Sequence, residues 1–335
     1  MINTTLDCLG QSLNRPNLCP SATWNPNAST FATGYSNYAI PPVIFIDQDN
    51  SIFVTDSQIN GIHVWVNGTM NLPQTISTGA GDPQGLFVTN NGDIYTGSSQ
   101  PYYHVEKWTL NSTVPVIVMN VTGLCFSLFV DINNTLYCSL GNGHLVLKTS
   151  LIDNGSIPIT AAGNGTSGLA PDMLNDPRGI YVDTTFNLYV ADSGNNRIQM
   201  FPSGQLNGTT LAGIGAPGTI VLSAPTAVIL DAAGYLFIVE YSGNRIVGTS
   251  PVGYRCLVGC SGSGSSSSQL NAPYSFSFDS SGNIFVIDSM NQRIQKFSID
   301  MNVCGKHLFV FLHLVIAFSL DMTSMKKLEM CHRST

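Results

Sequence analysis

The chain has 335 residues, of which 43% are apolar and only 10% are charged, and its formal net charge is -7. Because an average soluble domain is about one-quarter charged, this surface must be polar through Ser, Thr, Asn and Gly. With 13 Lys and Arg in all, the sequence shows no basic stripe that could neutralise nucleic-acid phosphates. The composition argues against a disordered chain and against a nucleic-acid-binding protein.

Residues 1–21 precede the regular pattern and form an N-terminal extension. The first ten residues lack the basic start and the apolar core of a signal peptide. The chain is therefore either leaderless or a piece of a longer protein. Residues 22–34 come directly before the first repeat of a pattern that continues to residue 302. We expect them to supply a fourth β-strand to the last repeat, which has only three.

Six repeats occupy residues 22–302, and each begins at a start residue that is Pro in five cases and Cys in one. The start residues are Pro41, Pro83, Cys125, Pro177, Pro225 and Pro273. Their spacings of 42, 42, 52, 48 and 48 residues match the length of one four-stranded propeller blade. The repeats lie near 41–66, 83–109, 125–149, 177–202, 225–249 and 273–298.

Three positions are shared across the repeats. An aliphatic residue stands eleven positions after every start residue, and an aromatic residue follows it. Asp stands six positions after the start residue in every repeat except the second, which has Thr89. Such coincidence fixes the register of the repeat. The aromatic set is Phe53, Tyr95, Tyr137, Tyr189, Phe237 and Phe285.

Each repeat predicts four short strands. In the fourth repeat, residues 180–182 form an apolar, β-prone run, a turn follows, and residues 188–190 form the next strand. A Gly/Asn-rich turn leads to a third strand at 197–201, and a weaker fourth strand lies at 209–213. The fold class is therefore all-β, a six-bladed β-propeller of four-stranded blades. Because the last repeat supplies only three strands, we expect residues 22–34 to join it and close the ring.

The stretches DPRGIYVDTTFNLYVADSGNNRIQMF, from Asp176, and APYSFSFDSSGNIFVIDSMNQRIQKF, from Ala272, resemble NHL repeats. The resemblance is stronger in repeats four to six than in repeats one to three, and it covers residues 22–302. It implies a six-bladed propeller. Relatives serve as protein-binding, ligand-sensing or RNA-binding surfaces, and some related propellers are lyases or lactonases, so the resemblance does not choose a function.

An acid and an arginine recur at a fixed spacing across the turn between the second and third strands. We expect these pairs to be structural, because an acid there can bind backbone N–H groups and a guanidinium. The pairs are Asp192 with Arg197, Glu240 with Arg245, and Asp288 with Arg293.

Metal sites find little support in the sequence. His63, His104 and His144 fall in consecutive repeats, but all are expected to start third strands, about 10 Å from the innermost strand, so a shared zinc site is disfavoured. A second candidate is calcium bound just before the start residues, and its ligands would be Asp82, Asp176, Asn175 and Asn271. No cofactor is expected, with calcium or zinc as the only candidates.

Eight cysteines, an even number, fit a disulfide framework in an oxidising compartment. We expect Cys125 and Cys138 to be free, buried thiols, because the predicted register does not place them opposite each other. The candidate local disulfides are Cys8 with Cys19 and Cys256 with Cys260.

Nine Asn-x-Ser/Thr sequons occur in the chain. Four of them fall in the turn after the third strand of repeats one to four, on the face opposite the turn that holds Asn195. Glycans there would shield that face, although turns favour Asn for their own reasons. These glycosylation candidates are Asn67, Asn111, Asn154 and Asn207.

Two segments stand outside the repeat pattern. Residues 261–268, SGSGSSSS, form a flexible loop. Residues 303–335 are a non-repeat tail with an apolar run at 308–320, which is shorter than the roughly 20 residues of a spanning helix. We expect no membrane span and poor packing of this tail on the propeller.

The leading interpretation is an extracellular or cell-surface recognition module that binds a protein or glycan and is not catalytic. The alternative is a metal-dependent hydrolase or lyase with its site at the channel mouth. RNA binding is disfavoured, because residues 22–302 hold 8 Lys and Arg against 17 Asp and Glu. The expected binding loops are Asn60-Gly61, Ser98 to Tyr103, Gly194 to Asn196 and Gly262 to Ser268.

Overall fold

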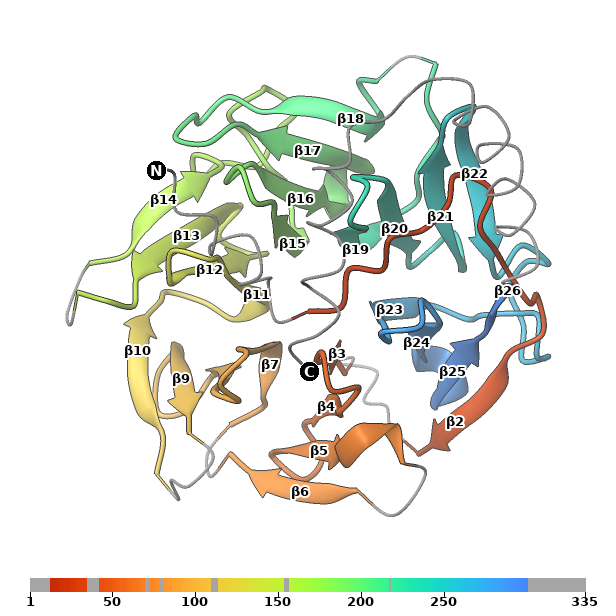
Figure 1. Cartoon of the computed structure of the whole chain (residues 1–335). Helices are drawn as coiled ribbons and strands as arrows, with labels where there is room; N and C mark the ends of the chain where they lie inside the picture. Colours follow the sequence, from red (N-terminus) through yellow and green to blue (C-terminus); the bar gives the residue numbers. More distant parts are fainter. Residues whose placement is uncertain are drawn as a thin grey trace, which may run out of the picture.

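The computed structural model describes residues 13–34, 42–69, 73–78, 81–109, 114–153, 157–216 and 218–300. Within them, six four-stranded antiparallel sheets stand as blades around a common axis (Figure 1). The six-bladed, all-β architecture predicted from the repeats is therefore confirmed. The start residue of the first repeat, Pro41, lies outside the described residues.

The blades follow chain order, with the first strand of each nearest the axis. Blade 1 contains β3 (Ile44–Ile46), β4 (Ile52–Asp56), β5 (Gly61–Trp65) and β6 (Gln74–Ser77). Blade 2 contains β7 (Gln84–Val88), β8 (Ile94–Ser98), β9 (His104–Trp108) and β10 (Val116–Asn120). Blade 3 contains β11 (Cys125–Val130), β12 (Thr135–Leu140), β13 (Leu145–Ser150) and β14 (Ile159–Ala162).

Blades 4 to 6 repeat this order, except that the outer strand of blade 6 comes from the start of the chain. Blade 4 contains β15 (Pro177–Val182), β16 (Leu188–Asp192), β17 (Arg197–Phe201) and β18 (Thr209–Gly213). Blade 5 contains β19 (Pro225–Leu230), β20 (Leu236–Glu240), β21 (Arg245–Ser250) and β22 (Gly253–Val258). Blade 6 contains β23 (Pro273–Phe278), β24 (Ile284–Asp288), β25 (Arg293–Phe297) and β2 (Ser29–Thr33).

The remaining elements are short. Strand β1 (Thr23–Trp24) pairs with β26 (Ile299–Asp300). Single 3-10 turns follow the third strand of blade 1 and the second strands of blades 4 and 6. These turns are η1 (Val66–Gly68), η2 (Ser193–Asn195) and η3 (Ser289–Asn291).

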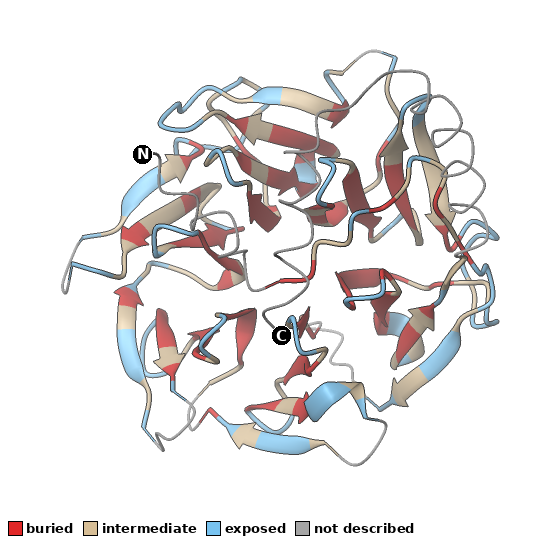
Figure 2. Cartoon of the chain, viewed as in Figure 1, coloured by how far each residue is buried: buried red, intermediate tan, exposed pale blue. Residues whose placement is uncertain are grey.

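Burial falls from the axis outward, as Figure 2 shows. Every residue of β23 is buried, whereas three of the five residues of β10 are exposed. Inner strands are covered on both sides by neighbouring blades, so they can be apolar throughout, while each outer strand meets solvent. This explains why the first two strands of each repeat carry the clearest sequence pattern and the fourth strand the weakest.

Aromatic rings link consecutive blades near the axis. The Phe45 and Phe87 ring centroids lie 5.2 Å apart, those of Phe87 and Phe129 lie 5.1 Å apart, and those of Phe129 and Tyr181 lie 5.3 Å apart. Tilted and edge-on contacts of this kind stabilise a core beyond the area that they bury. Blades 1 to 4 are thereby joined by one continuous row of rings.

The ring closes between the two ends of the repeat array. Strand β2 pairs antiparallel with β25, so that Thr33 lies opposite Arg293. The Phe31 ring of β2 packs edge-on against Trp65 of blade 1 at 5.4 Å and against Phe285 of blade 6 at 5.5 Å. The prediction that residues 22–34 supply the missing strand is confirmed, and the closure is non-covalent.

The two ends of the channel carry different connections. We call face 1 the end with the turns between strands one and two and between strands three and four, for example residues 131–134 and 66–68. Face 2 carries the turns between strands two and three, for example residues 193–196, and the connections between blades. Residues 13–22 run from the middle of the ring outward over blade 5 (red in Figure 1). We call residues 13–22 the strap. The sequence analysis did not predict this role for the N-terminal extension.

The expectation of free thiols at Cys125 and Cys138 is wrong, because the two form a disulfide with a Cα–Cα distance of 5.3 Å. The ladder between β11 and β12 is irregular between Cys125 and Ser127. This bulge, which the repeat pattern does not reveal, brings the two sulfur atoms together. Cys256 and Cys260 also form a disulfide. Cys19 is disulfide-bonded, and Cys8 lies outside the described residues.

No helix in the described ranges is long and apolar enough to cross a membrane. The apolar run at 308–320 lies outside those ranges.

We predict that Phe31→Ala lowers the free energy of unfolding by about 2 kcal/mol, because it removes a partly buried ring from the closing contact. The measurement is urea denaturation of the full chain. Thr33→Ala, an exposed substitution on the same strand, should change stability by less than about 0.5 kcal/mol. Equal effects of the two substitutions would contradict the importance of this closure.

Candidate binding face and channel mouth

The three acid–arginine pairs are buried ion pairs on the face 2 side. Asp192 Oδ2 lies 2.7 Å from Arg197 Nε, and their side chains are 0% and 4% exposed. The Asp288–Arg293 pair has the same separation of 2.7 Å, with 0% and 13% exposure. The Glu240–Arg245 separation is 2.6 Å, but the Arg245 side chain is 32% exposed. The pairs differ mainly in how completely the guanidinium is buried.

Each buried pair fixes the connection that enters its blade. Arg197 donates hydrogen bonds to the carbonyls of Leu169, Ala170 and Met173. Asp192 Oδ1 accepts a hydrogen bond from the backbone N–H of Asn175 at 2.7 Å. A charged group thus satisfies several backbone atoms of a long loop at once, which holds the loop in one conformation.

Blade 6 repeats this arrangement. Arg293 donates to the carbonyls of Ser265, Ser266 and Gln269, and Asp288 Oδ1 accepts from the N–H of Asn271 at 2.7 Å. The serine-rich loop expected to be flexible is therefore pinned along one side. Asn175 and Asn271, considered above as calcium ligands, use their backbone N–H groups in these structural contacts.

The histidines do not come together. His104 pairs with Ser98 and occupies the position of the repeat arginine. His63 lies two positions later in its strand than that arginine, and His144 immediately precedes β13. Only His104 starts its third strand, so the expectation that all three histidines do so is wrong for His63 and His144.

Each histidine contacts its own surroundings. His63 Nε2 lies 3.0 Å from Asp56 Oδ2, and His104 Nδ1 lies 2.7 Å from the Tyr102 carbonyl. His144 Nδ1 accepts a hydrogen bond from the backbone N–H of Asp176 at 3.2 Å. Asp82 and Asp176, the two acidic candidates for a calcium site, directly precede blades 2 and 4, which are separated by blade 3. Within the described ranges no three His, Cys, Asp or Glu side chains gather as a metal site.

At the face 2 end of the innermost strands, residues that directly follow the start residues of three repeats come together in a cluster. The sequence analysis considered only the residues before the start residues and so missed this cluster. The cluster consists of Phe126, Arg178 and Tyr274.

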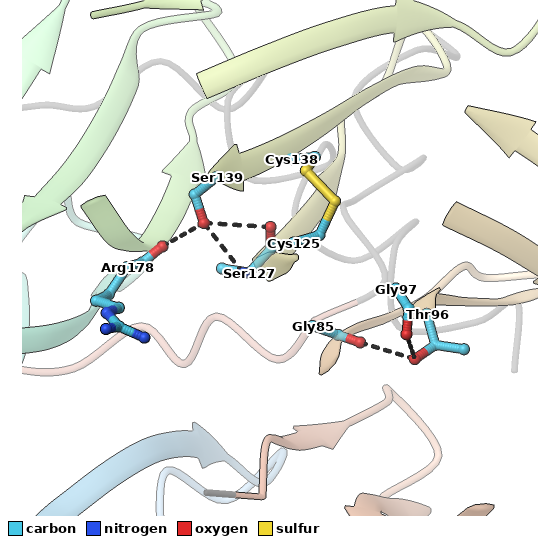
Figure 3. The surroundings of a disulfide bond; sticks show 8 residues. All are labelled: Gly85, Thr96, Gly97, Cys125, Ser127, Cys138, Ser139 and Arg178. Carbon is cyan, nitrogen blue, oxygen red and sulfur yellow. Dashed lines mark hydrogen bonds between the residues drawn. A yellow bond between two sulfur atoms is a disulfide. The ribbon is translucent and has the colours of Figure 1, made fainter. Parts of the chain in front are cut away.

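Arg178 links the members of this cluster. Figure 3 shows its backbone carbonyl accepting a hydrogen bond from Ser139 Oγ, near the Cys125–Cys138 disulfide. Its Nε and Nη2 lie 3.0 and 2.8 Å from Asp176 Oδ2, and its guanidinium carbon lies 3.7 Å from the centroid of the Phe126 ring. The guanidinium also lies close to the side chain of Tyr274 from blade 6, two blades further along the ring. Burial raises the pKa of Tyr274, so its hydroxyl stays protonated beside the cation. Arg178 and Tyr274 therefore connect blades 4 and 6 past the intervening blade 5.

The innermost strands of all six blades, together with Leu13 of the strap, line a cavity of about 80 Å³. Its walls are mainly apolar, with Ser127, Ser275 and Ser277 as polar exceptions. Ser275 Oγ accepts a hydrogen bond from Ile44 N–H, and Ser277 Oγ accepts one from Ile46 N–H. These hydroxyls join blade 6 to blade 1, so they serve the ring rather than an open passage.

The described sequons are exposed. Asn67 and Asn207 lie between the third and fourth strands of blades 1 and 4, on face 1, and both are exposed. Asn111 and Asn154 lie outside the described residues. Asn164, another exposed sequon, lies on face 2, where its Nδ2 is 3.0 Å from Asp172 Oδ2.

Face 2 also presents large apolar and tyrosine side chains from several blades. Tyr102 and Tyr103 in blade 2 are 52% and 41% exposed. Leu169 and Val221, in the connections before blades 4 and 5, are 58% and 80% exposed. Such residues are typical of protein-binding surfaces.

Comparison with known proteins agrees with this architecture. The NHL repeat matches residues 174–201, and no curated protein matches the chain. A Bacteroides thetaiotaomicron protein of unknown function superposes with a TM-score of 0.61 at 16% identity, covering 87% of this chain and 76% of that one. A putative gluconolactonase gives 0.58 at 13% identity, and a streptogramin B lyase gives 0.52 at 13%, each covering 87% of this chain and 98% of the other.

At these identities the similarity to solved structures concerns the fold alone. The chain is a six-bladed β-propeller. Its fourth blade contains an NHL repeat, which includes the Asp192–Arg197 pair.

We predict that Arg197→Met destabilises the full chain by about 3–5 kcal/mol, because it leaves the buried Asp192 carboxylate without its cation. Arg245→Met should cost clearly less, since that guanidinium is 32% exposed. Urea denaturation of both variants measures the difference. Similar losses, or a loss below about 1 kcal/mol at Arg197, would show that burial does not govern these pairs.

Proposed function

We propose that this protein is an extracellular or cell-surface recognition module that binds a protein partner through face 2. The observation that carries the proposal is the construction of that face. Its long connections are held by buried ion pairs, and they expose apolar and tyrosine side chains. A surface that is fixed before binding loses little conformational entropy on association.

Two further features support this assignment. Disulfides persist in oxidising compartments such as the extracellular space, and two lie within the described ranges. The strap fills the channel mouth of face 1, and this face also carries the exposed sequons Asn67 and Asn207. Face 2 has an exposed sequon of its own at Asn164, so the filled mouth of face 1 is the stronger reason to assign the protein partner to face 2. A glycan remains the other ligand class for this face.

A hydrolase or lyase at the channel mouth is the second candidate. The observation that favours it is the gathering of Asp176, Arg178 and Tyr274 at one end of the axis. Retention of about one equivalent of calcium or zinc after dialysis of the secreted chain against a mild chelator, measured by elemental analysis, would favour this candidate.

Substitutions on the two faces test the binding proposal. A face 2 variant, Tyr102→Ser with Leu169→Ser and Val221→Ser, should weaken binding of the labelled, secreted full chain to intact cells at least tenfold. The matched face 1 variant, Val66→Ser with Leu206→Ser and Val252→Ser, also replaces exposed side chains and should bind normally. Equal loss in both variants, or binding that survives in both, would reject face 2.

Pretreatment of the cells identifies the class of partner. Binding that is lost after mild proteolysis and kept after glycosidase treatment is expected for a protein partner. The reverse pattern would assign a glycan instead.

Occupied sequons are a separate expectation. When the full chain passes through a secretory pathway, Asn67→Gln and Asn207→Gln should each lower its intact mass by one N-glycan. Peptide-N-glycosidase should remove the same mass from the parent chain. An unchanged mass in both variants would leave these residues as ordinary turn asparagines and remove the argument that glycans shield face 1.

A further inference from the structure

The channel mouth on face 1 offers a distinct set of groups to a ligand. The four rings of the aromatic row, Phe45, Phe87, Phe129 and Tyr181, line the axial cavity. The innermost strands end here, and the backbone carbonyls of Asp47, Phe278 and Leu230 accept hydrogen bonds at this mouth. An apolar hollow surrounded by hydrogen-bond acceptors suits an aliphatic side chain followed by hydrogen-bond donors.

The strap meets this description residue by residue. Leu13 is buried, pairs with Asp47 in an isolated antiparallel bridge, and closes the apolar cavity. Asn14 Nδ2 donates to the carbonyl of Asp47 at 2.6 Å and to that of Phe278 at 3.2 Å. These two carbonyls belong to blades 1 and 6, so one side chain forms hydrogen bonds to two blades.

Arg15 contacts the neighbouring blades 5 and 4. Its Nη2 donates to the Asp231 carbonyl at 2.8 Å and its Nε to the Leu230 carbonyl at 3.4 Å. Its guanidinium carbon lies 5.8 Å from the centroid of the Tyr181 ring, within the range of a cation–π interaction. The backbone N–H of Ala232 donates to the carbonyl of Pro16 at 3.2 Å.

These contacts resemble those of a bound peptide ligand more than those of a segment that only packs against the propeller. Asn14 and Arg15 use side-chain donors of defined geometry, so the contacts depend on residue type and not merely on bulk. Together with Leu13 and Pro16, they reach blades 1, 4, 5 and 6.

The resident peptide does not satisfy the site completely. Asp231 is 0% exposed, and its Oδ2 has no hydrogen-bond partner among the described residues. An unpaired, buried carboxylate oxygen is costly, and a cationic ligand that reached it would gain that interaction. Nearby, the Asp183 carboxylate, which accepts hydrogen bonds from Tyr189 and Asn187, adds a second acidic group. The surroundings therefore favour a cation over an anion.

We propose that the face 1 mouth is a binding site for a linear peptide with an aliphatic residue followed, two positions later, by arginine. Residues 13–16, Leu-Asn-Arg-Pro, occupy this site as an internal ligand. A peptide of the same chemistry from another chain can displace them. This site is independent of face 2 and does not rest on the function proposed above.

The experiment uses the full chain with Leu13→Ser and Arg15→Ser, which weakens the internal ligand. The probe is a fluorescent, acetylated peptide of residues 13–18, titrated by anisotropy. It should bind this variant at least tenfold more tightly than the parent chain, in which the site is already filled. A probe with Ser in place of Arg should bind at least tenfold more weakly. Asn17→Ser, at an exposed strap position, is the matched control and should behave as the parent.

Absence of binding to a variant with a native circular dichroism spectrum would overturn the proposal, as would equal binding of the two probes. If the variant fails to fold, hydrogen exchange of the parent chain decides. Excess arginine-containing peptide should then accelerate exchange at residues 13–18, whereas the serine peptide should not. Exchange that does not respond to either peptide would make the strap a structural closure alone.

Discussion

The structure depends on closing a ring of six sheets without a covalent bond. A sheet edge left open at the last blade would expose unpaired backbone groups, and the pairing of β2 with β25 removes that edge. Phe31 adds the side-chain contact, because its ring lies between blades 1 and 6. Closure fixes the position of every innermost strand, and therefore the geometry of both channel mouths.

The two ends of the channel are closed by different chemistry. On face 2, a cation from blade 4 lies close to a tyrosine of blade 6 past the intervening blade 5, and a phenylalanine ring stacks on the guanidinium. On face 1, the strap inserts a leucine and directs an asparagine and an arginine at backbone carbonyls. The same ring thus presents a rigid loop surface at one end and a peptide-filled site at the other.

The fold was predictable because the strands of each repeat can be recognised from the residues of that repeat alone. Aliphatic and aromatic residues at fixed positions gave the blades, and the missing fourth strand indicated the role of residues 22–34. The strap was not predictable, since its partners are main-chain carbonyls of blades far away in sequence, and main-chain atoms leave no trace in residue type. The Cys125–Cys138 disulfide depends on a local bulge, which the repeat pattern hides. Arg178 and Tyr274 each follow the start residue of their repeat, so a comparison of that position across the repeats would have indicated both residues.

Native-state hydrogen exchange of the full chain tests the central claim of closure by β2 most directly. If closure holds the ring together, amides of β2 should exchange only through global unfolding, with the same opening free energy as those of β24 and β25. Exchange of β2 at a markedly lower free energy, while β24 and β25 stay protected, would show that the ring persists without its closing strand and would contradict the account.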